Sequence, residues 1–191
     1  MSTDRGIKEW AAVIAAMREG TQSVLVRVYE PPHNELLLYP TYNFYGSKKN
    51  SPEEFNRMFQ SPFWEMARDA GSQAMERAQK DSFVDIDCFA KVDQAIEVRD
   101  LSVWSRLEPY FIWSADHVRN YCKGSKSGSV WLWLCRIYKL PKALMIGRTS
   151  ALPPNTYRHH EDVSTEKARP VLSDADYERT KSEIIKTIGV R

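Results

Sequence analysis

Two long extended segments constrain what this chain can fold into. The residues from Phe83 to Val98 mostly alternate between apolar and polar side chains, and those from Val130 to Tyr138 are apolar on both faces. An alternating strand has one solvated face, whereas a strand that is apolar on both faces lies inside a sheet. The sequence therefore predicts a sheet in which the 130–138 segment is a central strand.

Shorter elements are expected around these two strands. Apolar residues at helical spacing predict a helix over 5–19, and Ser-Pro pairs at 51–52 and 61–62 are typical of helix starts. Strands are expected at 24–29 and 35–39, and short helices at 101–107 and after Ser114. The pattern indicates one α+β domain over residues 1–191, with a mostly antiparallel sheet or partly closed barrel and helices packed around it.

Within that domain the sequence predicts a core at about 5–147, an irregular segment at 148–172 and a C-terminal docking helix at 173–189. The longest purely apolar run, at 130–135, is far shorter than the roughly 20 residues of a membrane span. The first 20 residues carry charges and no apolar signal core, so a cytoplasmic protein without a membrane partner is expected.

Of the three cysteines, Cys88 and Cys135 are expected in the core, and Cys122 is the one expected to meet solvent.

Charge is distributed unevenly along the chain. The sequence has 27 Lys and Arg residues and 25 Asp and Glu residues, yet no acidic residue lies between Asp116 and Glu161. That window also contains Trp131, Trp133 and three tyrosines. Basic residues interleaved with aromatic ones are typical of surfaces that neutralise phosphates and stack on unpaired bases.

The leading hypothesis is a non-enzymatic module that binds nucleic acid or a nucleotide-like anion. The candidate phosphate-binding residues are Arg119, Lys123, Lys126, Arg136, Lys139 and Arg148, and the candidate stacking residues are Tyr39, Tyr42 and Phe44. Trp131 and Trp133 fit either a core or a binding face. The same charges also fit internal pairing, in which Arg136 and Lys139 meet the acidic 81–100 segment.

Two alternatives belong to other function classes. Asp85 and Asp87 on one strand face suggest a divalent-metal-dependent enzyme acting on a phosphorylated or nucleic-acid substrate. A protein-interaction subunit is the second alternative. Common nucleotide-binding and hydrolase motifs are missing from the sequence, and the adjacent ligands of 159–162 have poor spacing for zinc. We therefore favour binding over catalysis and expect no cofactor and no metal.

Several short segments resemble an uncharacterised prokaryotic family, domain of unknown function 1802. They occur in order as Lys8-Glu9-Trp10-Ala11, Leu36-Leu37-Leu38-Tyr39-Pro40-Thr41, Ile112-Trp113-Ser114 before Val118-Arg119, and Leu134-Cys135-Arg136-Ile137-Tyr138-Lys139-Leu140-Pro141, with Pro170-Val171-Leu172-Ser173 resembling the family's tail. Because that family has no established activity, the resemblance implies no catalytic residue. Three segments typical of the family are replaced here, after Arg27, at Phe44-Tyr45 and at Gly147-Arg148-Thr149-Ser150.

Overall fold

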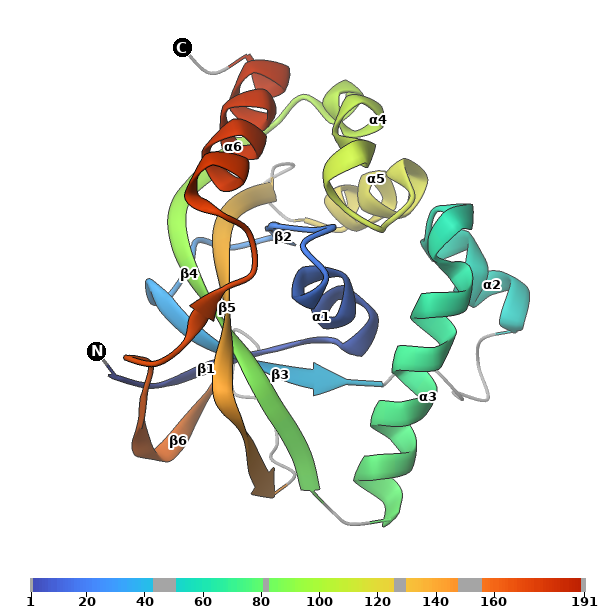
Figure 1. Cartoon of the computed structure of the whole chain (residues 1–191). Helices are drawn as coiled ribbons and strands as arrows, with labels where there is room; N and C mark the ends of the chain where they lie inside the picture. Colours follow the sequence, from blue (N-terminus) through green and yellow to red (C-terminus); the bar gives the residue numbers. More distant parts are fainter. Residues whose placement is uncertain (1, 43–50, 81–82, 126–129, 148–155, 190–191) are drawn as a thin grey trace.

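The computed structural model describes residues 2–42, 51–80, 83–125, 130–147 and 156–189. Within these residues seven strands form one mixed sheet in the order β2-β5-β4-β3-β1-β6, and β7 pairs with β5 (Figure 1). The strands are β1 (Ser2–Trp10), β2 (Val24–Arg27), β3 (Glu35–Thr41), β4 (Phe83–Val98), β5 (Val130–Gly147), β6 (Thr156–Ser164) and β7 (Arg169–Pro170). Among the described strands only β1 and β3 pair in parallel, which confirms an α+β fold with a mostly antiparallel sheet.

The two long predicted strands form the centre of the sheet. β4 and β5 pair along almost their whole lengths, and two register shifts bend the ladder. β5 lies between β4 and β2, as its two apolar faces predicted, but it continues past Tyr138 to Gly147. Trp133 on this strand is fully buried, and its indole Nε1 donates a hydrogen bond to the Tyr29 carbonyl.

The prediction of a helix over 5–19 is wrong in its first half. Residues 2–10 form β1, and only Ala11–Arg18 form α1. β1 pairs with β3 on one side and β6 on the other, and these long-range hydrogen bonds outweigh the local helical spacing of Ile7 and Trp10. Gly20 ends the helical region with a φ of 77°, a conformation that favours glycine.

The prediction of an irregular segment at 148–172 is wrong for the two stretches that form strands, and residues 148–155 lie outside the described residues. Residues 156–164 form β6 against β1, and 169–170 form β7 against β5. Adding β6 gives the N-terminal strand a partner on each side. The segment looks irregular in the sequence because its prolines argue against a strand. The pairing partner of β6 also lies more than 140 residues away, so no local pattern predicts it.

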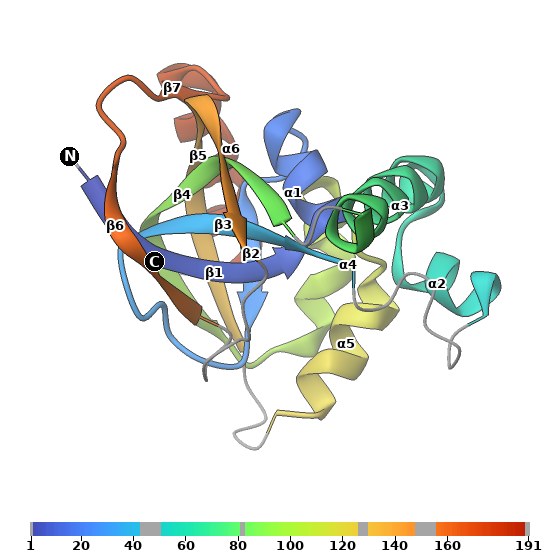
Figure 2. The same cartoon turned by 90° about the horizontal axis from the view of Figure 1, so that it is seen from below.

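Helices surround the sheet. They are α1 (Ala11–Arg18), α2 (Pro52–Met58), α3 (Trp64–Lys80), α4 (Trp104–Leu107), α5 (Ala115–Lys123) and α6 (Asp174–Ile188), with 3₁₀ turns at Ser61–Phe63, Leu101–Val103 and Glu108–Tyr110. Helix α1 lies between the sheet and α3, and most of its residues are buried (Figures 1 and 2). The C-terminal helix α6 lies within the predicted range 173–189, is capped by Ser173 and packs through Tyr177 and Ile184. No helix in the described ranges has the length and apolar character needed to cross a membrane.

The sheet is strongly curled, although it does not close into a barrel. β2 and β1 are separated by three strands in the hydrogen-bonding order. Nevertheless the Arg27 side chain at the end of β2 contacts the Glu9 side chain near the end of β1. The curl therefore brings the ends of two non-neighbouring strands together, and a cavity lies at this junction.

Candidate functional site

The cavity at the junction of β1 and β2 has a volume of about 240 Å³. It is bounded by the end of β1, the end of β2, the segment before α5 and one face of α5. We call it the aromatic pocket, and its lining residues are Lys8, Glu9, Trp10, Val26, Arg27, Trp113, His117, Val118 and Tyr121.

A buried ion pair forms part of the pocket lining. The Arg27 guanidinium donates to Glu9 Oε2 at 2.5 Å, and the two side chains are only 12% and 3% exposed. Glu9 Oε1 also accepts the backbone N–H of Trp10 at 2.6 Å, and Arg27 donates to the Val26 carbonyl at 2.9 Å. Burial alone would lower the pKa of Arg27, but attraction to the Glu9 carboxylate, the hydrogen bond to that carboxylate and the nearby Tyr29 and Tyr121 hydroxyls together raise it. Arg27 therefore stays charged.

Aromatic rings form the wall beside this ion pair. The Trp113 ring stacks with Phe59 at 4.7 Å and with His117 at 4.8 Å, and Trp10 meets it edge-on at 5.1 Å. Trp113 is 9% exposed, so the stack holds it in place. Desolvation lowers the pKa of His117, which keeps its imidazole neutral at neutral pH.

The segment before α5 holds Trp113 in position through hydrogen bonds to the turn after α2. The Gln60 amide nitrogen donates to the carbonyl oxygens of Phe111 and Trp113. Ser114 follows directly, and its hydroxyl accepts the His117 N–H as the N-cap of α5. A serine N-cap fixes where the helix begins, and that in turn places His117 and Tyr121 one helical turn apart on the pocket side.

Tyr121 is the more open part of the wall. The residue is 39% exposed, although burial of the hydroxyl raises the pKa of its phenol. Lys8 adds a positive charge to the lining, and its Nζ lies 4.8 Å from the centre of the Tyr39 ring. Because Glu9 and Arg27 cancel each other, Lys8 gives the charged part of the lining a net positive charge.

A second cleft of about 470 Å³ lies on the other side of His117, between α2 and α5. We call it the α2–α5 groove, and it is lined by Glu54, Arg57, Met58, Ser114, Asp116, His117 and Asn120. His117 is the residue that the linings of both cavities share.

Those of the predicted basic residues that the structure describes do not form one cluster, because Arg119 and Lys123 lie on α5, and Arg136 and Lys139 lie on β5. Arg119 pairs with Asp116 on its own helix, and Arg136 pairs with Asp174 at the start of α6. Lys123 is exposed at the end of α5, whereas Lys139 lines a different groove near Arg18. Lys126 and Arg148 lie outside the described residues.

The predicted stacking residues also lie elsewhere. Tyr39 is 4% exposed and packs edge-on against Tyr157, and Tyr42 is half-buried against the same cluster. Phe44 lies outside the described residues. Trp133 is a core residue, with the Arg27 guanidinium 5.8 Å from its ring centre, and Trp131 is half-buried against the core.

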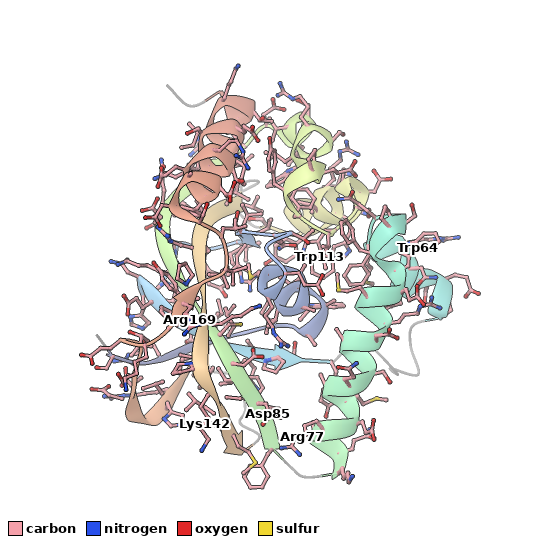
Figure 3. All side chains as sticks on the ribbon, in the orientation of Figure 1. Trp64, Arg77, Asp85, Trp113, Lys142 and Arg169 are labelled. Carbon is pink, nitrogen blue, oxygen red and sulfur yellow. The ribbon has the colours of Figure 1, made fainter. Side chains whose placement is uncertain are left out.

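Asp85 and Asp87 line a groove between β4 and the helices α1 and α3, but each has an arginine partner. Asp85 pairs with Arg77 at 2.9 Å, and Asp87 pairs with Arg18 at 3.0 Å (Figure 3 labels Arg77 and Asp85). In the part of the chain that the structure describes, no group of three or more His, Cys, Asp or Glu side chains could hold a metal ion.

The three cysteines are all buried. This confirms Cys88 and Cys135 as core residues and contradicts the expected exposure of Cys122, which is 1% exposed. Cys122 lies on the inner face of α5 with Val118, and the amphipathic spacing of that helix places it toward the core.

Sequence reasoning missed the pocket residues because they come from four separate places in the chain. A signal for them was nevertheless present. The segments that carry the family resemblance include Lys8-Glu9-Trp10, Trp113 and Val118, and Arg27 precedes one of the replaced family segments. The resemblance identifies these segments, but only the curl of the sheet shows that they meet.

Comparisons with known proteins give a family and one distant structural likeness. No functionally curated protein matched the chain. A crystal structure of a point mutant of the ZmASCH protein from Zymomonas mobilis is similar, with a TM-score of 0.46 and 14% identity over 94% of this chain and 97% of that one. The family model described as a domain of unknown function, DUF1802, matches residues 6–183. That match spans all four stretches that line the aromatic pocket, and the chain therefore belongs to the DUF1802 family.

Proposed function

We propose that this chain is a non-enzymatic module that binds nucleic acid or a nucleotide-like anion, with an unpaired base in the aromatic pocket. The observation that carries the proposal is the combination of aromatic walls with a buried, charged Glu9–Arg27 pair in one cavity. The proposal keeps the ligand class expected from the sequence but moves the site away from the residues predicted there.

The chemistry of the lining suits a flat heteroaromatic ring. Tyr121 and Trp10 offer π faces and edges, and stacking of a base on an aromatic side chain contributes roughly 1–3 kcal/mol. Beside the rings, Arg27 is a donor and the Glu9 carboxylate is an acceptor. A nucleobase presents donors and acceptors along its edge, so it satisfies both kinds of group at once.

The charge of the lining suits an anion attached to that ring. Lys8 is a further cationic side chain in the lining, beside the Glu9–Arg27 pair. A phosphate near Lys8 would gain Coulomb attraction, which dissolved salt weakens. The described lining contains neither a cysteine nor a pair of carboxylates, and this favours binding over catalysis.

The metal-dependent alternative has less support. Both carboxylates on which it depends already have guanidinium partners, and a divalent ion would have to displace Arg77 and Arg18. We therefore do not propose a catalytic role for Asp85 and Asp87.

Tyr121→Ala tests the proposal, with Trp64→Ala as the matched control. Tyr121 and Trp64 are both 39% exposed, but Trp64 begins α3 outside the pocket (Figure 3 labels Trp64). Fluorescence titration with labelled single-stranded DNA and RNA at several salt concentrations is the measurement. We expect Tyr121→Ala to weaken binding about tenfold, because one stacking contact is lost, and Trp64→Ala to leave it unchanged. Equal effects of the two variants, or no binding at low salt, would contradict the proposal.

A further inference from the structure

Building on the proposed function, we infer that the ligand is an unpaired nucleic-acid strand of at least two nucleotides. One base occupies the aromatic pocket, and the neighbouring nucleotide lies in the α2–α5 groove, where Arg57 contacts the phosphate. A free mononucleotide would occupy only the first of these two cavities.

The first observation is that the two cavities adjoin. His117 lines both of them, so a chain leaving the aromatic pocket across His117 enters the groove directly. The imidazole is neutral, because desolvation lowers its pKa, and its stacking on Trp113 keeps it flat against the wall. An uncharged aromatic ring at this position can lie between two neighbouring bases of an unpaired strand, with one base in each cavity.

The second observation is that the groove is preformed. The Ser114 N–H donates to the Met58 carbonyl at 2.8 Å, and the Ser114 hydroxyl donates to the Arg57 carbonyl at the same distance. An isolated β-bridge joins Phe59 to Trp113 beside them. These bonds hold the end of α2 against the start of α5, so a ligand would not have to order the groove.

The third observation is the charge that the groove leaves available. The Glu54 carboxylate accepts the Ser51 N–H at 2.8 Å as part of a capping box, and Asp116 pairs with Arg119 at 2.7 Å. Arg57 is exposed, and in the ranges that the structure describes no carboxylate lies within salt-bridge distance of it, although its charge helps to lower the pKa of Glu53 one helical turn earlier. Arg57 is the cation in a lining that also holds the Glu54 and Asp116 carboxylates, and it is the group that would contact the phosphate, while Asn120 in the same lining has an amide suited to a base edge.

The test compares ligand length with variants of Arg57. Isothermal titration of a nucleoside monophosphate, the corresponding dinucleotide and a tetranucleotide would be repeated with Arg57→Ala, Arg57→Lys and, as a control, Arg99→Ala. Arg99 is a strongly exposed arginine outside both cavities. We expect the dinucleotide to bind at least tenfold more tightly than the monophosphate. Arg57→Ala should remove most of that gain without changing monophosphate affinity, Arg57→Lys should keep part of it, and Arg99→Ala should change nothing.

The outcomes separate this inference from the proposed function. If the monophosphate binds as tightly as the dinucleotide, or Arg57→Ala has no effect on the dinucleotide, the inference is wrong while the pocket proposal stands. If a duplex of the same sequence binds as tightly as the single strand, the claim of an unpaired strand is wrong. If none of these ligands binds at low salt, the proposed function itself fails. Circular dichroism of each variant would confirm that it is folded.

Discussion

At the scale of single residues, the Glu9–Arg27 pair shows how a charge is kept inside an apolar neighbourhood. Removing two charges from water is costly, and the pair persists because its members also bond to the backbone of Trp10 and Val26. The guanidinium in addition lies near the face of Trp133. Each group therefore has several partners, and removing one of the two leaves the other buried without its counter-charge.

Glu9→Ala should be strongly destabilising for this reason. We expect it to lower the free energy of unfolding by about 3 kcal/mol or more, because the buried Arg27 guanidinium loses its counter-charge. Asp116→Ala, which removes the partner of Arg119 at an 87% exposed site, should cost less than about 1 kcal/mol. Urea denaturation followed by circular dichroism measures both. Similar losses for the two variants would show that the buried pair has no special role.

At the scale of elements, the first strand depends on its contact with β6. Gly6 on β1 faces the buried Tyr157 ring of β6, and a Cβ at Gly6 would lie 2.1 Å from the Tyr157 Cε1 atom. The ring also packs edge-on against Tyr39. No side chain larger than hydrogen fits between these strands without moving the ring.

Gly6→Ala should therefore weaken the β1–β6 pairing. The buried ring has to shift, and overpacking of this kind typically costs 1–3 kcal/mol. Gly147→Ala is the matched control on another strand, because a Cβ there would meet no atom within 4 Å. Thermal unfolding should show a lower melting temperature for Gly6→Ala only. An unchanged melting temperature would mean that the Tyr157 ring moves aside freely.

The elements also show which parts of the fold can be predicted from sequence. β4, β5 and the capped helices α2, α5 and α6 follow local rules of alternation and capping, and they were predicted correctly in kind. β1 and β6 were not, because each becomes a strand only by pairing with a distant partner. The pocket was missed for the same reason, since its residues meet only after the sheet curls.

At the scale of the whole molecule, several basic residues of the second half pair with acidic residues of other elements. Arg136 of β5 meets Asp174 of α6, Arg158 of β6 meets Asp4 of β1, and Lys181 of α6 meets Asp93 of β4. Sequence reasoning had left internal pairing open beside the binding hypothesis, but with Arg136 and Lys139 against the acidic 81–100 segment, whereas Arg136 pairs with Asp174. Counting charges along the sequence cannot distinguish internal pairing from a basic binding surface, because the paired residues lie 38 to 154 positions apart.

The reaction rates of the three cysteine thiols test whether the whole fold opens in one cooperative step. Burial raises the pKa of Cys122 to about 11 and that of Cys135 to about 12, and it also raises that of Cys88. We expect all three thiols of the native protein to react with an aromatic disulfide reagent at least a hundredfold more slowly than in guanidinium, because only the thiolate attacks. One thiol that reacts quickly under native conditions would reveal local opening, and Cys122→Ser would identify α5 as its source.

The position of β1 between β3 and β6 has a consequence for how the protein is made. Ser2–Trp10 leaves the ribosome well before one of its neighbours in the sheet, Thr156–Ser164, has been synthesised. Until then one edge of the nascent strand is left without its final partner. The segment bearing Lys8, Glu9 and Trp10 thus acquires this neighbour only after the residues of β6 have been synthesised.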